Sequence, residues 1–180
     1  MSSKPITVIF GSGANVGAAI TKKFLGAGYR VATVRRSAPE PATPSQDGNS
    51  LDIQADLSQP TQIPQVFETI KKTWNAAPRV VIWNVAGLTP PTDPDNIFSI
   101  PNAALESDLG LMVTSPFAAA GEAVKGWGAS GDAGRFIMTG NLLPRTLIPV
   151  ANFTTLGVGK SGGAYWVGTA DALYKAKDWR

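Results

Sequence analysis

Lys160 is the residue whose surroundings most clearly indicate chemistry. It ends the segment Leu156-Gly157-Val158-Gly159-Lys160, on a helix that the sequence predicts from about Thr155 to Lys175. The chain contains no His and no Cys. Imidazole bases, thiol nucleophiles, disulfides and zinc-finger spacing are therefore excluded, and any proton transfer must use carboxylates, Lys, Tyr, hydroxyls, backbone groups or water. We expect no metal site.

A glycine-rich segment near the N-terminus has the composition of a phosphate-binding turn. It reads Gly11-Ser12-Gly13-Ala14-Asn15-Val16-Gly17 and lies between the first predicted strand and the first predicted helix. Glycines at such a place let the chain turn tightly, and they let backbone N–H groups and the helix N-terminus approach a pyrophosphate. The alternative is a tight turn that binds no ligand.

Two arginines close the second predicted strand. Arg35 and Arg36 stand where an Asp or Glu would hold the ribose 2′-hydroxyl of NAD. A guanidinium group suits a 2′-phosphate instead, because its planar set of donors matches phosphate oxygens. The pair therefore favours NADP(H), and the alternative is two solvated charges.

Polar residues also follow the third and fourth predicted strands. Asp56-Leu57 comes directly after the third strand, and Asn84-Val85-Ala86-Gly87 comes after the fourth. In a parallel sheet, ligands bind at the carboxyl ends of the strands, so these segments are expected to line one cleft. Each also has a structural interpretation, Asp56 as a loop or helix-capping residue and Asn84 as a turn former.

The elements that position these residues alternate along the chain. Apolar or alternating runs predict strands at 6–10, 29–34, 51–55, 80–83 and 135–138, and helical spacing predicts helices at about 16–27, 60–74, 102–127 and 155–175. Alternating strands and helices predict an α/β fold with a doubly wound parallel sheet and right-handed crossovers. With 180 residues and no repeat, residues 1–180 are expected to form a single domain.

Together the glycine-rich turn, Asp56-Leu57, Asn84 with Gly87, and Lys160 resemble the short-chain dehydrogenase/reductase family. The resemblance implies a Rossmann-like fold and an NADP(H)-dependent oxidoreductase acting on a small organic carbonyl or alcohol. It places Asp56 near the adenine and Lys160 on the nicotinamide ribose. Two positions depart from the family pattern: Phe10 replaces a threonine, and Asn15 replaces the middle glycine, although Asn tolerates left-handed backbone.

The catalytic positions depart further from the family, which uses Asn, Ser, Tyr and Lys. Lys160 matches, but Leu156 occupies the tyrosine position. The serine position falls on Asn141 or on Leu143, depending on the direction of counting, and Thr139 offers a hydroxyl nearby. We therefore name Lys160, Asn141 and Thr139 as catalytic candidates. Loss of the tyrosine should weaken carbonyl reduction, because a positioned proton donor contributes about 10²–10⁴-fold.

The family's helical Asn position falls on Met112, four residues before Pro116. A proline inside a helix leaves the carbonyl four residues earlier without its partner. We expect the Met112 carbonyl to hold a water near Lys160 and to replace part of a proton relay. The alternative is a kinked helix that fits its neighbours.

Composition limits the possible partners. Lys and Arg number 16 against 13 Asp and Glu, a net charge of +3, and the positive residues are scattered, so no nucleic-acid partner is expected. Nowhere do about 18 apolar residues run together, and the N-terminus has no signal-like apolar core. These features predict a cytoplasmic protein that does not bind membranes, and the family resemblance implies a small-molecule substrate.

Small residues on the last two helices predict self-association. They are Gly159, Gly162, Gly163 and Gly168 on the last helix, and 118–121 on the preceding one. Glycine inside a helix costs about 1 kcal/mol relative to alanine, so close packing should compensate. The family implies a homodimer through these helices, and the alternative is packing within one chain.

Two further functions stay open on this scaffold. One is a non-redox enzyme, an isomerase or cyclase, and the other is a catalytically silent nucleotide-binding module. The resemblance also implies that relatives continue through at least one more strand and a substrate-covering loop. We expect this chain to lack both, as a sheet truncated after the helix that carries Lys160.

Overall fold

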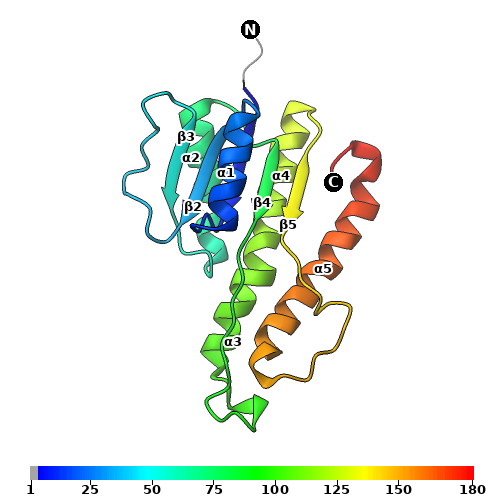
Figure 1. Cartoon of the computed structure of the whole chain (residues 1–180). Coiled ribbons are helices and arrows are strands. Elements are labelled where there is room, and N and C mark those ends of the chain that lie inside the picture. Colours follow the sequence, from blue (N-terminus) through cyan, green and yellow to red (C-terminus); the bar gives the residue numbers. More distant parts are fainter. Residues whose placement is uncertain (1–3) are drawn as a thin grey trace.

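A parallel sheet of five strands forms the centre of the molecule, which confirms the predicted α/β architecture. The computed structural model describes residues 4–180. The strands are β1 (Ile6–Phe10), β2 (Arg30–Arg35), β3 (Ser50–Gln54), β4 (Val80–Trp83) and β5 (Arg135–Met138). Their order across the sheet is β3-β2-β1-β4-β5 (Figure 1). The strand order therefore reverses between β1 and β4, the place where such sheets bind ligands.

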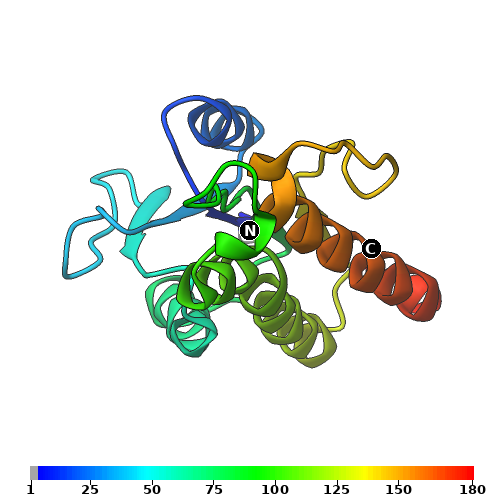
Figure 2. The ribbon, with the colours of Figure 1, turned by 90° about the horizontal axis from the view of Figure 1, so that it is seen from below.

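Helices cover both faces of the sheet. They are α1 (Val16–Gly26), α2 (Ile63–Trp74), α3 (Asn102–Leu109), α4 (Ser115–Ser130) and α5 (Thr154–Tyr174), with a π-helix at Gly110–Thr114 between α3 and α4. Short 3₁₀ helices lie at Pro60–Gln62, Ile97–Ser99, Ala151–Phe153 and Lys175–Lys177. α1 packs on one face, and α2 and α4 pack on the other (Figure 2). Within residues 4–180, no helix has the length and apolarity needed to cross a membrane.

Apolar side chains on both sides of the central strands explain the buried sheet. Every residue of β1 and of β4 is buried, as expected of central strands in a parallel sheet. Phe10 and Trp83 stack with ring centroids 4.8 Å apart in the layer under α2 and α4. Ile9, Val31 and Ile82 form the layer under α1. These two layers fix the strand ends, and therefore the place where the following loops meet.

Pro116 changes the helical register and corrects one prediction. The helix predicted at 102–127 contains the π-helix, in which an N–H reaches the carbonyl five residues earlier. In that register the carbonyl opposite the missing proline N–H belongs to Leu111 rather than to Met112. The Leu111 oxygen accepts the indole N–H of Trp83 at 2.9 Å. The expected water-holding role of Met112 thus loses its premise, because the freed carbonyl binds a tryptophan.

Close packing within the chain accounts for two of the α5 glycines. A Cβ on Gly159 would lie 2.5 Å from Met112 Cε, and a Cβ on Gly163 would lie 2.7 Å from Met138 Cε. These glycines let α5 approach the π-helix and the end of β5. Around Gly121 and Gly168, by contrast, a Cβ would meet no atom within 4 Å. The predicted homodimer stays a prediction, and intrachain contact explains part of the pattern behind it.

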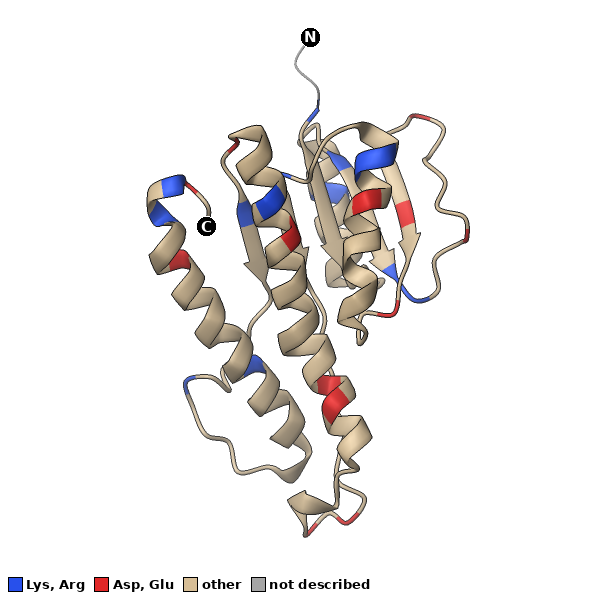
Figure 3. Cartoon of the chain, turned by 180° about the vertical axis from the view of Figure 1, so that it is seen from behind, with Lys and Arg blue, Asp and Glu red and all other residues tan. Residues whose placement is uncertain are grey.

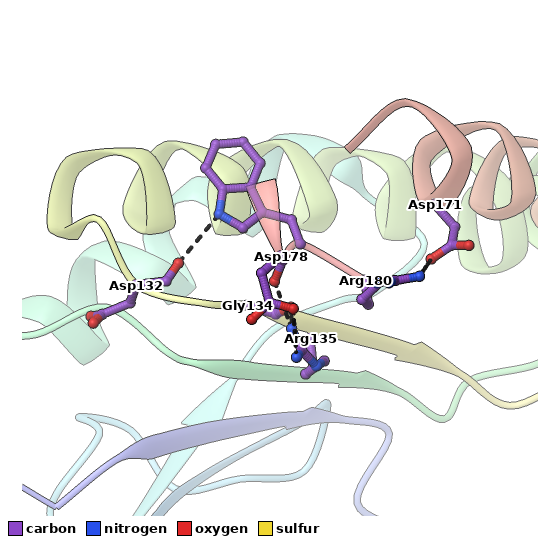
Figure 4. A network of polar contacts seen from close by, with 7 residues as sticks. Asp132, Gly134, Arg135, Asp171, Asp178 and Arg180 are labelled. Atoms are coloured by element: carbon purple, nitrogen blue, oxygen red, sulfur yellow. Dashed lines mark hydrogen bonds and ion pairs between the residues drawn. The ribbon is translucent and has the colours of Figure 1, made fainter. Parts of the chain in front are cut away.

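The last residues of the chain pair with the outer edge of β5. The N–H of Gly134 donates to the Asp178 carbonyl at 3.3 Å, and the N–H of Phe136 donates to the Arg180 carbonyl at 2.6 Å. Arg135 also binds the Asp178 carboxylate, with 2.9 Å between Nη2 and Oδ1 (Figure 4). These contacts cover part of an edge whose backbone groups could otherwise pair with another chain.

Gly159→Ala should destabilise the fold by about 1–3 kcal/mol, because the new methyl group overpacks the contact with Met112. Gly26→Ala is the matched control, since a Cβ there meets nothing within 4 Å, and it should be neutral or stabilising by up to about 1 kcal/mol. Urea unfolding followed by tryptophan fluorescence measures both. Equal free energies of unfolding for the two variants would contradict close packing at Gly159.

Candidate functional site

A polar cleft lies at the carboxyl ends of β1 to β4 and joins most residues predicted to bind a cofactor. Its volume is about 720 Å³, within the usual range for small-molecule sites. The predicted residues that line it are Gly11, Ser12, Gly13, Arg35, Arg36, Asp56, Leu57, Asn84 and Ala86. Sequence reasoning did not single out the others, which are Ala14, Ser37, Ser58, Val85, Ser107 and Leu111.

Asn84 fastens the glycine-rich turn to the end of β4. Its Nδ2 donates to the Gly11 carbonyl at 3.0 Å. Gly11 has φ +83°, and a Cβ there would lie 2.5 Å from the Asn84 carbonyl oxygen. A side chain at Gly11 is therefore excluded both by conformation and by space. At Gly13 a Cβ would meet nothing within 4 Å, which leaves the backbone beside the cleft open.

The turn leads into α1, whose N-terminus adds a partial positive charge. α1 carries no acidic residue in its first turn, and Asn15, which precedes it, makes no side-chain capping bond. Asn15 has φ −93°, so its tolerance of left-handed backbone is not used. A helix start of this kind favours an anion near its N–H groups. Val16 and Gly17 take part as the first residues of this helix rather than as lining of the cleft.

The two arginines at the end of β2 have different surroundings. Arg35 forms an ion pair with Asp52 on β3, with 3.2 Å between Nη2 and Oδ2, and the side chains are 44% and 41% exposed. The other Asp52 oxygen accepts the Thr33 hydroxyl. Exposed ion pairs are worth about 0–1 kcal/mol, so a phosphate could readily replace Asp52 as the partner of Arg35. Arg36 is exposed and also lines the cleft.

Asp56 shapes the loop that follows β3. Its Oδ1 accepts the N–H of Ser58 at 3.0 Å and the Ser58 hydroxyl at 2.8 Å. The Asp56 N–H in turn donates to Gln62 Oε1 at 2.8 Å. Asp56 therefore acts as a loop residue, which is the structural alternative considered for it. Contact with a ligand is compatible with it, because an ionised carboxylate has a second oxygen that accepts hydrogen bonds.

Lys160 does not line the polar cleft, but it joins α5 to the segments that follow β4 and β5. Its side chain is 6% exposed, and Nζ donates to the Thr139 carbonyl at 2.7 Å and to the Val85 carbonyl at 3.3 Å. Burial lowers the pKa of Lys160 below the ordinary lysine value of 10.5. A lysine ammonium has three N–H donors, so one remains for a further acceptor.

The other catalytic candidates are held by local contacts. The Thr139 hydroxyl donates to the Trp83 carbonyl at 3.4 Å, while Asn141 is exposed and its Oδ1 accepts the Leu143 N–H at 3.1 Å. Leu156 is half-buried on α5. A Cβ on the neighbouring Gly157 would lie 3.9 Å from Leu143 Cδ1. If Leu143 is counted as the serine position, aliphatic side chains stand at both hydroxyl positions of the family, whereas Asn141, the other choice, carries an exposed amide.

Asp108 is a buried residue that the sequence analysis missed. It is 5% exposed, and its Oδ2 accepts the Thr89 N–H at 2.9 Å. The Thr155 hydroxyl oxygen accepts the same N–H at 3.2 Å. A Cβ on Gly87 would lie 2.2 Å from Asp108 Oδ1, so this glycine makes room for the carboxylate. Asp108 and Thr155 thus clamp the loop after β4 between α3 and α5.

Three comparisons relate the chain to known proteins. A family model described as short chain dehydrogenase matches residues 5–164. The short chain dehydrogenase/reductase dmxR12 of Cryptosporiopsis sp. (strain 8999) is 32% identical over 191 residues, which cover 99% of this chain and 74% of that protein.

Solved structures share the fold at lower identity. A metagenomic short-chain oxidoreductase in complex with NADP has TM-score 0.83 and 16% identity, covering 99% of this chain and 79% of that chain. For 4-hydroxyisoleucine dehydrogenase complexed with NADH the TM-score is 0.82 at 16% identity, covering 98% and 72%. A short-chain dehydrogenase/reductase of Serratia marcescens has TM-score 0.77 and 22% identity, covering 97% and 72%.

Asp108→Ala should cost about 1–3 kcal/mol of unfolding free energy, because the half-buried Thr89 N–H loses its shorter hydrogen bond. Asp108→Asn should cost less, since an amide oxygen still accepts. Glu106→Ala is the control, an exposed acidic residue on the same helix. Urea titration compares the variants, and a cost for Asp108→Ala no larger than that for Glu106→Ala would contradict the clamp.

Lys160 should also make stability depend on alkaline pH. Its folded-state pKa lies below 10.5, the ordinary value that we take for the unfolded chain. At a pH between the folded-state and unfolded-state pKa values, the unfolded chain binds more protons, so stability rises with pH. The difference in unfolding free energy between the wild type and Lys160→Met should therefore increase as pH approaches 10.5 from below. Urea titrations across that range measure it. Lys71→Met, an exposed site, controls for the loss of one lysine, and a flat difference for Lys160→Met would contradict the burial effect.

Proposed function

Because this chain belongs to the short-chain dehydrogenase/reductase family, we propose that it binds NADP(H) in the polar cleft. The proposed reaction interconverts a small organic carbonyl and its alcohol. One observation carries the proposal. A single cavity of about 720 Å³ is lined by the glycine-rich turn, Arg35, Arg36 and Asn84.

The cleft fits a phosphorylated dinucleotide. At Gly13 a Cβ would meet nothing within 4 Å, so a diphosphate could approach the backbone N–H groups of the turn closely. Arg35 and Arg36 also line the cleft and would bind a 2′-phosphate. Asp56 and Leu57 line it too, and an adenine would lie beside them.

Lys160 is the proposed proton donor in place of the missing tyrosine. The dinucleotide, when bound, supplies hydride to the carbonyl carbon. The third N–H of Lys160 would then donate a proton to the carbonyl oxygen, so an N–H bond breaks and an O–H bond forms. A hydronium ion from solvent would reprotonate the amine, so that the reduction consumes one hydride and one proton overall. Burial lowers the pKa of Lys160, which makes its ammonium a stronger acid. Alcohol oxidation follows the same steps in reverse.

We propose that the protein is cytoplasmic and forms a homodimer through α4 and α5. Phe117 on α4 is 62% exposed, and Tyr165 and Leu173 on α5 are 80% and 71% exposed. Gly121 lies on the same pair of helices with no atom within 4 Å of its Cβ position. Apolar side chains beside an uncovered glycine favour a second helix pair against this surface.

A second candidate function is a nucleotide-binding module without redox chemistry. Leu156 and Leu143 favour it, because neither side chain can hold or protonate a substrate oxygen. The two candidates share the cofactor site and differ in turnover. An isomerase or cyclase would consume substrate without oxidising the dinucleotide.

Arg35→Ala with Arg36→Ala should weaken NADPH binding by about 10–100-fold, since hydrogen bonds between charged groups contribute about 1.5–3 kcal/mol. NADH binding should change little, because NADH lacks the 2′-phosphate. Titration followed by nicotinamide fluorescence measures both affinities. Arg79→Ala is the matched control, an exposed arginine at the opposite end of the strands. Unchanged NADPH affinity in the double variant would overturn the phosphate assignment.

The same preparation then separates the candidate functions. Incubation with NADPH and a panel of carbonyl compounds should oxidise the cofactor, and Lys160→Met should lose this turnover. NADPH binding without oxidation by any compound would favour the silent module. Substrate loss with the cofactor unchanged would indicate isomerisation or cyclisation.

A further inference from the structure

Arg35 borders two cavities, the polar cleft and a second one between α1 and the strands β2 and β3. The second cavity has a volume of about 400 Å³, and its lining includes Ser12, Lys22, Thr33, Arg35 and Asp52. Ser12 and Arg35 line the polar cleft as well, whereas Asp52 does not. The ion pair between Arg35 and Asp52 therefore belongs to the second cavity, outside the proposed cofactor site.

This ion pair draws the guanidinium back from the carboxyl end of β2. In the parallel register Asp52 lies opposite Thr33, whereas Arg35 lies opposite Gln54. Asp52 is therefore two residues, or about 6.6 Å, nearer the start of the strands than Arg35. To lie 3.2 Å from Asp52 Oδ2, the Nη2 of Arg35 must point back along the sheet. A cofactor would bind beyond the carboxyl ends of the strands, in the other direction.

Thr33 holds the Asp52 carboxylate at this level of the sheet. The Thr33 side chain is buried, and its hydroxyl donates to Asp52 Oδ1. Asp52 Oδ2 is the oxygen that remains for Arg35. Figure 3 shows this pairing of charges, with an acidic band on β3 next to a basic band at the end of β2. The carboxylate is thus a fixed partner, and the long arginine side chain is the part that can turn.

We infer that Asp52 is a positioning residue that narrows the preference of the site for NADP(H) over NAD(H), because it competes with the 2′-phosphate for Arg35. The inference rests on the proposed function and adds a residue that sets its cofactor preference. Asp52 acts through Arg35 and touches no cofactor itself.

A bound 2′-phosphate can meet Arg35 in two ways, and Asp52 weakens binding in both. If Arg35 turns to the phosphate, the ion pair with Asp52 is lost. If Arg35 keeps Asp52, the carboxylate stays close to a group that carries about two negative charges, and like charges repel. An exposed ion pair changes an equilibrium by at most about fivefold. The competition therefore moderates NADPH binding without preventing it.

The geometry favours competition over a role of Asp52 in ordering Arg35 for the phosphate. The Nη2–Oδ2 distance of 3.2 Å is longer than the 2.7–2.9 Å or so that is usual between charged groups. Both side chains are more than 40% exposed, and such a pair orders a long side chain weakly. Lys22 lines the same cavity, so a cation stays near Asp52 when Arg35 turns away.

Arg36 differs from Arg35 in having no such competitor. Its backbone carbonyl accepts Gln54 Nε2 at 2.8 Å, which fixes the main chain at the end of β2. Within residues 4–180 its guanidinium forms no ion pair. Arg36 can therefore bind a phosphate without giving up a partner, and it provides an internal comparison for Arg35.

Asp52→Asn tests the inference. The amide oxygen would keep the hydrogen bond from Thr33, which leaves the amide N–H groups facing Arg35, and donors do not bind donors. NADPH should bind the variant about two- to fivefold more tightly than the wild type. NADH lacks the 2′-phosphate and should bind both equally, as titrations followed by nicotinamide fluorescence measure. Asp52→Ser also removes the carboxylate, and it should give the same shift if the Asn variant fails to fold.

Two backgrounds show whether Asp52 acts through Arg35. In Arg35→Ala, the further change Asp52→Asn should leave NADPH affinity unchanged, whereas in Arg36→Ala it should still tighten binding. Glu68→Gln is the matched control. It removes one carboxylate and an exposed ion pair with Lys72, at 2.8 Å, and it lines neither cavity. NADPH should bind it like the wild type.

The outcomes separate the inference from the proposed function. Unchanged or weaker NADPH binding by Asp52→Asn, an equal gain for NADH, or a gain that survives in Arg35→Ala overturns the inference and leaves the proposed function standing. Absence of NADPH binding by the wild type contradicts the proposed function, and the inference with it.

Discussion

The buried ammonium of Lys160 is the constraint on which the arrangement of the site depends. It ties α5 to the carbonyls that follow β4 and β5, and a desolvated cation must keep such partners because water cannot replace them. α5 must therefore lie close to the strand ends. Gly159 and Gly163 provide that closeness, since any larger residue would meet Met112 or Met138. The glycines that weaken the helix by propensity are thus the condition for the lysine contact.

Side-chain hydrogen bonds also hold the glycine-rich turn and the loop after β4, on the other side of the cleft. Asn84 binds the Gly11 carbonyl across the β1 and β4 ends, and Asp108 binds the loop after β4 from α3. Both act on the segment 84–89, one at each end, while Lys160 holds the carbonyl of Val85 between them. Three polar side chains from different elements therefore position one short loop, and this loop separates the polar cleft from the helix that carries Lys160.

The sequence predicted what local pattern controls and missed what packing between distant segments controls. β1, β4 and β5 were predicted to the residue, because their apolar runs have clear ends, whereas β2 and β3 shifted by one residue at polar positions. The cleft residues were found because they directly follow strands. Asp108 was missed because its partners lie 19 and more residues away, and the π-helix was missed because proline alone does not say which register the chain adopts.

The aliphatic residues near Lys160 connect the altered chemistry to the lysine itself. Leu156 shares a helix face with Lys160, one turn earlier, and a tyrosine there would bring a hydroxyl toward the ammonium. Leu156 offers no such hydroxyl, and burial lowers the pKa of Lys160. Of the tyrosine and lysine pair that the family uses at this place, the chain therefore keeps only the ammonium, which its burial makes a stronger acid.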